Sequence, residues 1–194
     1  FKDAELLRFG CSGEPFASFK ETMLIKKAAE KYPDLKFHFH TNGILADEKK
    51  LKELNVFYKT DVITLSLHSA NFWTYNKIVR GGNWRLVMKN MKLYSQMKKE
   101  GLIKQFRMIF VVYDENYKDM EKFAELAGKH NAAAEFWALR YVQNTELGRN
   151  FDRYSIINKS HKHYKELAKI LKKPVFGREN VILYPELKEI REGD

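Results

Sequence analysis

Residues 36–68, KFHFHTNGILADEKKLKELNVFYKTDVITLSLH, contain two short apolar runs separated by a helical pattern. The first run, Lys36–Thr41, is closed by an Asn-Gly pair, and the second, Val62–His68, alternates apolar and polar residues. Between the runs, the spacing of apolar residues from Asp47 to Leu54 is that of a short helix. Two strands joined through a helix are expected to be parallel, because a crossover returns the chain to the same end of the sheet.

The same alternation of strand and helix continues on both sides of this segment. Further strands are expected at Glu5–Phe9, Phe106–Tyr113 and Glu135–Leu139, with a short extra strand at Val181–Tyr184. Helical spacing predicts helices at residues 18–28, 73–79, 84–94, 117–127 and 155–172. This alternation predicts an α/β fold with a parallel sheet, either open and doubly wound or curved into a barrel.

Polar residues mark the predicted starts of three helices. Ser18 and Glu21 have the spacing of a capping box, and Asn83 and Asn116 each precede a helical stripe of apolar residues. Serine and asparagine suit these positions because their side-chain oxygens accept hydrogen bonds from the first backbone N–H groups of a helix.

Two histidine pairs have a spacing of two residues. His38 and His40 lie on one predicted strand and therefore share a face, which is expected to be solvated or packed rather than metal-binding. His161 and His163 fall in the predicted helix 155–172, where this spacing makes them face apart and form no site.

The composition is that of a folded globular protein. The chain has 194 residues, 44% hydrophobic and 14% aromatic, and no apolar run long enough to span a bilayer. Its single cysteine, Cys11, excludes an internal disulfide framework and favours a reducing, cytoplasmic setting, with Cys11 a small packing residue. The net charge of +10 is dispersed and comes without a zinc-finger or RNA-binding motif, so nucleic acid is disfavoured as a partner.

Small and polar residues follow the predicted strands. They occur in Gly10–Pro15, Thr41–Gly43 and Ser66–His68, and Arg80-Gly81-Gly82 lies one segment later. Because the carboxyl ends of parallel strands share one edge, these residues are expected at a small-molecule site. On the third strand Thr64, Ser66 and His68 share a face, which indicates either a wet barrel lumen or an edge strand with a solvated face.

Two charged residues at these strand ends could recognise an amino-acid group. Glu14, between Gly13 and Pro15, could accept a ligand ammonium, although a loop carboxylate that caps a helix is the plainer interpretation. Arg80 could bind a ligand carboxylate through two parallel hydrogen bonds, or it could be a surface arginine before a glycine turn.

Five segments together resemble the S-adenosylmethionine (SAM) radical enzyme superfamily. They are LRFGCSGEPF at Leu7–Phe16, HTNG at His40–Gly43, ITLSLH at Ile63–His68, IVRGG at Ile78–Gly82, and Arg107–Asn116. The SGEP stretch resembles the Gly-Gly-Glu-Pro motif of that family, with Ser12 in place of the first glycine. The resemblance implies a partial (β/α) barrel over residues 1–150, about strands 2 to 6 of the family fold, and a C-terminal helix and tail over 151–194.

The resemblance also implies roles for individual residues in binding SAM. Glu14 would receive the methionine ammonium with Ser12 and Gly13 beside it, and Thr41 and Asn42 would line the same pocket. Ser66 would lie near the ribose or the carboxylate, and Arg80 would bind the carboxylate.

For the other end of SAM, the resemblance places Val111 and the backbone near Ala138 closest to the adenine. A substrate would enter the lumen near Thr64, His68 and Arg107. An oxidoreductase of this kind would draw electrons from a flavodoxin or a ferredoxin.

One departure from the family pattern concerns its [4Fe-4S] cluster. The family holds the cluster on a Cys-x3-Cys-x2-Cys motif just after its first strand, and this motif would precede Glu5. The resemblance therefore implies a fragment that lacks the first strand and the cluster loop, cannot cleave SAM alone, and binds no metal through its own residues. Three alternatives stay open: a barrel without a cluster that acts as a binding module, a basic RNA-associated protein, and a barrel enzyme without a cluster, such as an aldolase. The third ranks last, because no lysine follows a strand where it could form a Schiff base.

Overall fold

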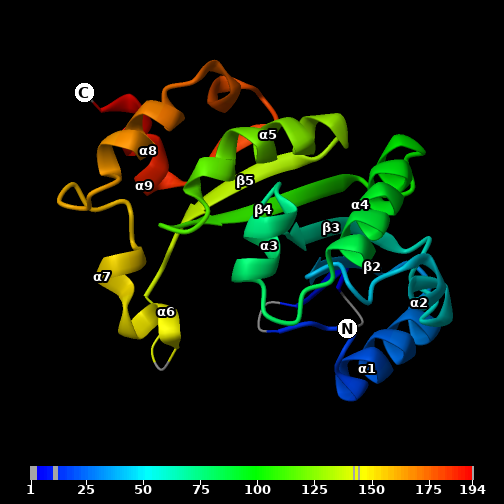
Figure 1. Ribbon diagram of the computed structural model, residues 1–194. Helices are drawn as coiled ribbons and strands as arrows, with labels where there is room; N and C mark the ends of the chain where they lie inside the picture. Colours follow the sequence, from blue (N-terminus) through cyan, green and yellow to red (C-terminus); the bar gives the residue numbers. More distant parts are fainter. Residues whose placement is uncertain (1–3, 11–12, 142, 144, 194) are drawn as a thin grey trace. The chain divides into compact units, whose positions relative to one another are not determined.

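The computed structural model describes residues 4–10, 13–141, 143 and 145–193, which form an α/β fold (Figure 1). Six strands make one sheet in the order β1-β2-β3-β4-β5-β6, and the registers of β1 with β2, β2 with β3 and β5 with β6 are parallel. The sheet is open, because no pairing between β1 and β6 closes it in the described part of the chain. The predicted α/β class and parallel sheet are confirmed, and the architecture fits a partial barrel.

The chain divides into two compact units. The first comprises residues 1–67, 82–108 and 130–132, and the second comprises residues 68–81, 109–129 and 133–194. The strands are β1 (Leu6–Phe9), β2 (Lys36–Thr41), β3 (Thr60–Ser66), β4 (Gln105–Val112), β5 (Ala133–Ala138) and β6 (Val181–Leu183). Strand β4 belongs to both units, since its residues up to Met108 lie in the first.

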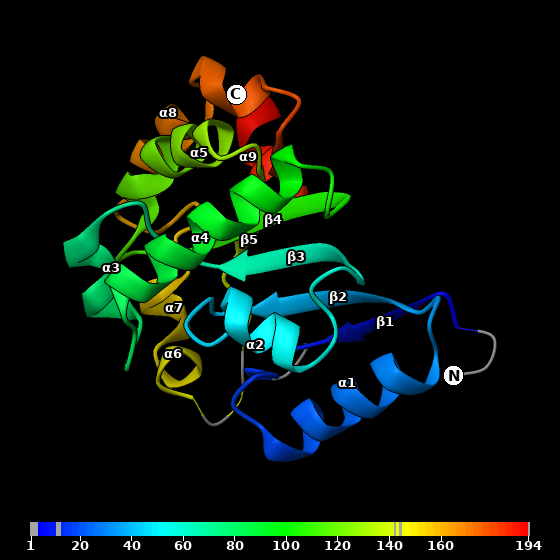
Figure 2. The ribbon, with the colours of Figure 1, turned by 90° about the vertical axis from the view of Figure 1, so that its right-hand side faces the viewer.

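The first unit contains β1, β2, β3 and three helices. These helices are α1 (Phe19–Lys31), α2 (Glu48–Glu53) and α4 (Trp84–Lys99). Each helix starts at a side-chain cap, with Ser18, Asp47 and Asn83 accepting hydrogen bonds from backbone N–H groups of the first turn. Figure 2 shows α1 running alongside β1 and β2.

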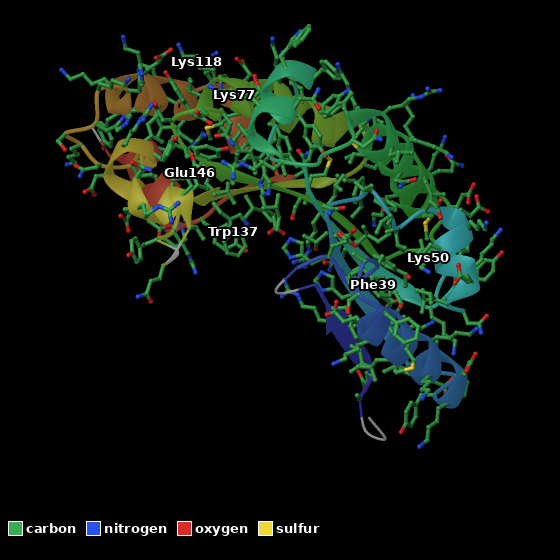
Figure 3. All side chains as sticks on the ribbon, turned by 60° about the horizontal axis from the view of Figure 1, so that its bottom comes forward. Phe39, Lys50, Lys77, Lys118, Trp137 and Glu146 are labelled. Atoms are coloured by element: carbon green, nitrogen blue, oxygen red, sulfur yellow. The ribbon has the colours of Figure 1, made fainter. Side chains whose placement is uncertain are left out.

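An aromatic cluster fills the space between the strands and helix α1. The rings of Phe9, Phe37 and Phe39 stack on the same face of β1 and β2, and Phe16 packs on Phe39, which Figure 3 labels. Phe37 and Phe39 are fully buried. Because side chains alternate along a strand, Arg8, His38 and His40 lie on the opposite face.

The second unit contains the remaining strands and helices. Its helical segments are α3 (Phe72–Ile78), η1 (Tyr117–Asp119), α5 (Met120–Lys129), α6 (Glu146–Arg149), α7 (Phe151–Tyr154), α8 (Tyr164–Leu171), η2 (Pro174–Gly177) and α9 (Pro185–Glu192). Phe110, Phe123, Phe136 and Phe176 form its aromatic core, and α5 covers β5 on this side (Figure 1).

Two expectations about elements are wrong. The helix predicted over residues 155–172 is reduced to α8, which begins at Tyr164, because residues 155–163 form turns. Strand β3 lies between β2 and β4 and is therefore not an edge strand. The polar row on β3 thus has a different cause from solvent at a sheet edge.

Candidate functional site

Glu14 links the loop after β1 to the end of β2. Its Oε2 accepts a hydrogen bond from the backbone N–H of Asn42 at 2.7 Å, and its Oε1 accepts one from Phe16 N–H at 3.3 Å. The hydroxyl of Thr41 lies 2.9 Å from both carboxylate oxygens. Helix α1 is capped by Ser18, so Glu14 does not have the capping role of the plainer interpretation.

Burial and hydrogen bonding act on Glu14 in opposite directions. Removal from water disfavours the charged carboxylate and raises the pKa of Glu14 above its usual value, and this effect is the larger one. The hydrogen bonds from Asn42, Thr41 and Phe16 favour the charged form and limit the increase. The carboxylate is thus held in place in surroundings that would be stabilised by a positive charge.

Gly10 allows this loop to leave β1 close to β2. Its φ of +88° is a left-handed conformation, and a Cβ at this position would lie 1.8 Å from the carbonyl oxygen of His40. Only glycine fits so close to another backbone. The substitution of Gly10 would therefore displace the loop that carries Glu14.

Thr41 and Asn42 support Glu14 and the turn that follows β2. Thr41 is buried, and besides contacting Glu14 its hydroxyl accepts a hydrogen bond from Gly43 N–H at 3.0 Å. The Asn42 side chain accepts one from Ile44 N–H at 3.0 Å. The structure brings both predicted residues together with Glu14, in the role of positioning its carboxylate.

The polar row on β3 is paired with histidines on β2. His38 Nε2 lies 2.8 Å from Thr64 Oγ1, and His40 Nε2 lies 2.6 Å from Ser66 Oγ. His38 and Thr64 are buried, with 7% and 2% of their surface exposed. The prediction that the two histidines share one strand face is confirmed, and their hydroxyl partners explain the polar residues within a central strand.

His68 and Val111 are joined in the second unit by hydrogen bonds. Val111 N–H donates to His68 Nδ1 at 3.1 Å, so the neutral ring carries its proton on Nε2. The Asn116 amide donates to the carbonyl oxygens of both His68, at 3.0 Å, and Val111, at 2.8 Å, while its own oxygen accepts from Tyr113 N–H. His68 itself has a left-handed φ of 60°.

Asn116 is therefore a residue whose role the sequence did not reveal. It was expected to cap a helix, but its side chain makes no capping hydrogen bond to η1. It is buried and instead ties together two segments far apart in the sequence. The cap pattern was ambiguous, because asparagine suits both a helix start and a buried bridge between loops.

A mainly apolar pocket lies within the second unit and has a volume of about 360 Å³. Val111 and Ala138, the two residues associated with adenine, both line it, together with His68, Trp137 and Arg140. Trp137, labelled in Figure 3, stacks on Tyr184 with ring centroids 3.6 Å apart, and the Arg140 guanidinium lies over its ring. The Trp137 indole N–H is buried and has no acceptor among the described residues.

Arg80 lies in the second unit, where its guanidinium forms an ion pair with Glu146 on α6, labelled in Figure 3. The Arg80 side chain is 86% exposed. An exposed ion pair contributes little to stability, so Glu146 is a replaceable partner for this arginine.

His161 and His163 do not face apart, contrary to the sequence-based expectation. They precede α8, and their Nε2 atoms lie 3.9 Å and 3.6 Å from the same atom, Asp114 Oδ1. His163 also stacks on the Tyr117 ring. The expectation failed because it placed both residues in a helix, whereas this segment turns before α8 begins.

Two of the predicted positions, Cys11 and Ser12, lie outside the described residues. Gly13 is described, has a φ of +110°, and has open space where a Cβ would be. No group of three or more His, Cys, Asp or Glu side chains in the described part of the chain could hold a metal ion. With one cysteine in the sequence, the chain does not fit a cluster held by three thiolates.

One comparison with known proteins covers the segments that carry these residues. No curated protein matches the chain. No helix among the described residues has the length and apolar character needed to cross a membrane. The family model described as the radical SAM superfamily matches residues 4–127, which is more than half of the chain and includes Glu14, Thr41, Ser66, Arg80 and Val111. The chain therefore belongs to the radical SAM superfamily.

Proposed function

We propose that this chain binds SAM as part of a radical SAM enzyme. The observation that carries the proposal is the environment of Glu14. Its carboxylate accepts hydrogen bonds from three donors, which are the backbone N–H groups of Phe16 and Asn42 and the hydroxyl of Thr41. An ionised carboxylate has about four lone-pair positions, so an acceptor position remains for one further donor.

A ligand ammonium suits that remaining position. Burial makes the negative charge of Glu14 costly, and a nearby positive charge lowers this cost. The methionine part of SAM supplies such an ammonium group, and a charge-assisted hydrogen bond is about twice as strong as a neutral one. Thr41 and Asn42 then act as positioning residues that hold the carboxylate for the ligand.

The adenosine part of SAM fits the chemistry of the pocket in the second unit. Its volume of about 360 Å³ is within the usual range for small-molecule sites, and its lining is mostly apolar. The buried Trp137 N–H needs an acceptor, and the ring nitrogens of adenine are acceptors. Ser66 and Arg80 are proposed to contact the ribose and the carboxylate, with Arg80 exchanging Glu146 for the ligand.

Members of this superfamily generally use SAM together with a [4Fe-4S] cluster. When bound, such a cluster would supply the electron for the reductive cleavage of SAM to a 5′-deoxyadenosyl radical, the species that takes a hydrogen atom from a substrate. The residues of this chain do not fit the cluster, so its ligands would come from outside this sequence. Thr64 and His68 are proposed to face the substrate, and a flavodoxin or ferredoxin is proposed as the electron donor.

The proposal is tested by calorimetric titration of the chain with SAM and with 5′-methylthioadenosine, which lacks the amino-acid group. Val111→Phe narrows the pocket and should weaken the binding of both ligands by about tenfold or more, because overpacking typically costs about 1–3 kcal/mol. Ile182→Phe, on the exposed face of β6 and outside the pocket, is the matched control and should change neither affinity.

Three results of this titration would be informative. Binding of both ligands, weakened only by Val111→Phe, supports the proposal. Absence of SAM binding would refute it. The full-length gene product should also be tested for iron uptake. If it binds SAM but takes up no iron, this would favour a binding module without a cluster.

A further inference from the structure

Helix α4 has one face in the core of the first unit and one face in solvent. Its buried residues repeat at helical spacing and are Val87, Asn90, Met91, Tyr94 and Met97. The Tyr94 hydroxyl donates a hydrogen bond to the carbonyl oxygen of Ala46 at 2.7 Å, and the Asn90 amide donates one to that of Gly43 at 2.9 Å. These bonds fix α4 on the turn after β2, so its outer face is held in a defined position.

The outer face of α4 carries cations at regular intervals. Arg85, Lys89 and Lys92 are exposed, and their spacing aligns them over about 10 Å of the helix. The sequence has 25 acidic residues, but none of them lies between Asp61 and Glu100. In the described part of the chain, no carboxylate forms an ion pair with any of the three cations. This face therefore has a positive potential.

Helix α2 lies beside α4 (Figure 1) and contributes two carboxylates, Asp47 and Glu48, to the hollow between the two helices. Both carboxylates already have partners. Asp47 caps α2 by accepting a hydrogen bond from the backbone N–H of Lys50, and Glu48 pairs with Lys52 at 2.5 Å. They do not pair with Lys89, which lines the same hollow.

The three cations border a groove along the first half of α4. The groove has a volume of about 980 Å³ and is lined by Asn83, by the apolar residues Trp84, Leu86 and Met88, and by the cations, all within the first unit. We call it the α4 groove. Leu86 is 38% exposed, although it is apolar. Tryptophan, methionine and arginine are residue types that are enriched in protein–protein interfaces.

We propose that the α4 groove binds an acidic helical segment of a partner protein. Such a segment has carboxylates about one turn apart, which match the spacing of Arg85, Lys89 and Lys92. Apolar side chains between its carboxylates would cover Leu86 and Met88, as when an amphipathic helix binds in a groove. This inference does not depend on the function proposed above.

The lining favours a protein over the other polyanions that a positive face attracts. A nucleic acid backbone would pair with the cations but offers no apolar group to the exposed Leu86. An anionic membrane requires apolar side chains that project into the lipid, whereas Trp84 and Met88 are half-buried in the groove.

The test measures binding of a fluorescently labelled helical peptide of about 16 residues to the full chain, by anisotropy at constant ionic strength. Glutamates occupy every third or fourth position of the peptide, with leucines between them, and a second peptide has glutamines in their place. The acidic peptide should bind saturably and the second should not. Replacing all three cations by glutamine (Arg85→Gln, Lys89→Gln, Lys92→Gln) should weaken binding about 3- to 150-fold, the range for losing three exposed ion pairs.

Leu86→Ser keeps the charge of the groove and tests its apolar part. Because Leu86 is exposed, this variant should fold normally, and it should weaken the acidic peptide about 3- to 10-fold through lost apolar contact. Unchanged affinity in this variant would overturn the proposal, since charge alone would then account for binding.

The matched control removes the same charge from another exposed helix, α1, by Lys20→Gln, Lys26→Gln and Lys27→Gln together. Peptide affinity should be unchanged in this control. Absence of saturable binding by the acidic peptide, or equal weakening by both triple variants, would overturn the proposal. Tighter binding of an oligothymidylate, or of vesicles containing phosphatidylglycerol, that is lost in the α4 triple variant would also overturn it, because the groove would then serve nucleic acid or lipid.

Discussion

The substitution Glu14→Gln tests whether Glu14 binds the amino-acid part of SAM and not its adenosine part. Glutamine keeps the shape of the side chain but removes its charge and replaces one carboxylate oxygen with an NH2 group. Oε2 accepts from Asn42 N–H and Oε1 accepts from Phe16 N–H. Whichever way the amide is turned, its NH2 group therefore meets a backbone N–H, and at least one hydrogen bond is lost.

The expected effect on SAM follows from the bond to its ammonium. A hydrogen bond to a charged group contributes about 1.5–3 kcal/mol, so SAM affinity should fall roughly 10- to 150-fold. Methylthioadenosine lacks the ammonium and should bind the variant as well as it binds the original chain. The ratio of the two affinities is measured by calorimetry at pH 7.5.

Stability provides the second measurement on the same variant. The loss of a hydrogen bond to a half-buried donor should lower the free energy of unfolding by about 1–3 kcal/mol. Burial raises the pKa of Glu14 in the folded state above its value in the unfolded state. The protonated side chain therefore adds to the free energy of unfolding at low pH, and this contribution is lost as the pH rises through the folded-state pKa. Glutamine does not titrate, so Glu14→Gln should lower the free energy of unfolding more at pH 4 than at pH 7, as measured by urea unfolding.

An equal loss of SAM and methylthioadenosine binding would refute the reasoning about the ammonium. It would mean that Glu14 acts only as a link between the loop after β1 and the end of β2. Glu14→Asp serves as a control, because it keeps the charge and shortens the side chain, and it should retain more preference for SAM over methylthioadenosine than Glu14→Gln does.

Two further predictions concern the hydrogen-bonded pairs. The pKa of His38 is about 4 in the folded state and near 6.5 in the unfolded state, so the free energy of unfolding should rise with pH between these values. The variant His38→Gln has no such group and should show a smaller rise. Urea unfolding midpoints measured from pH 4 to 7.5 test this. Asn116→Ala removes three hydrogen bonds of a buried side chain and should lower the free energy of unfolding in urea by about 1–3 kcal/mol. The variant Asn83→Ala, which removes an exposed helix cap, should lower it by only about 1 kcal/mol. Equal losses would contradict the bridging role of Asn116.

Much of the fold could be predicted because strand–helix alternation is a strong periodic signal. Strand β2 has the predicted bounds Lys36–Thr41, and the caps at Ser18 and Asn83 are confirmed. The failure over residues 155–163 has a local cause. Asn158 Oδ1 accepts hydrogen bonds from both the backbone N–H and the hydroxyl of Ser160, and such bonds compete with helix formation.

The candidate site could be predicted only to the level of residue type. The sequence placed Glu14, Thr41 and Asn42 at strand ends, and the family resemblance implied that all three contact the ligand. In the structure Thr41 and Asn42 donate hydrogen bonds to Glu14. The pairing of His38 with Thr64 depends on the register between β2 and β3, which a polar row on one strand does not specify. Long-range pairs of this kind appear only when the strands are placed side by side.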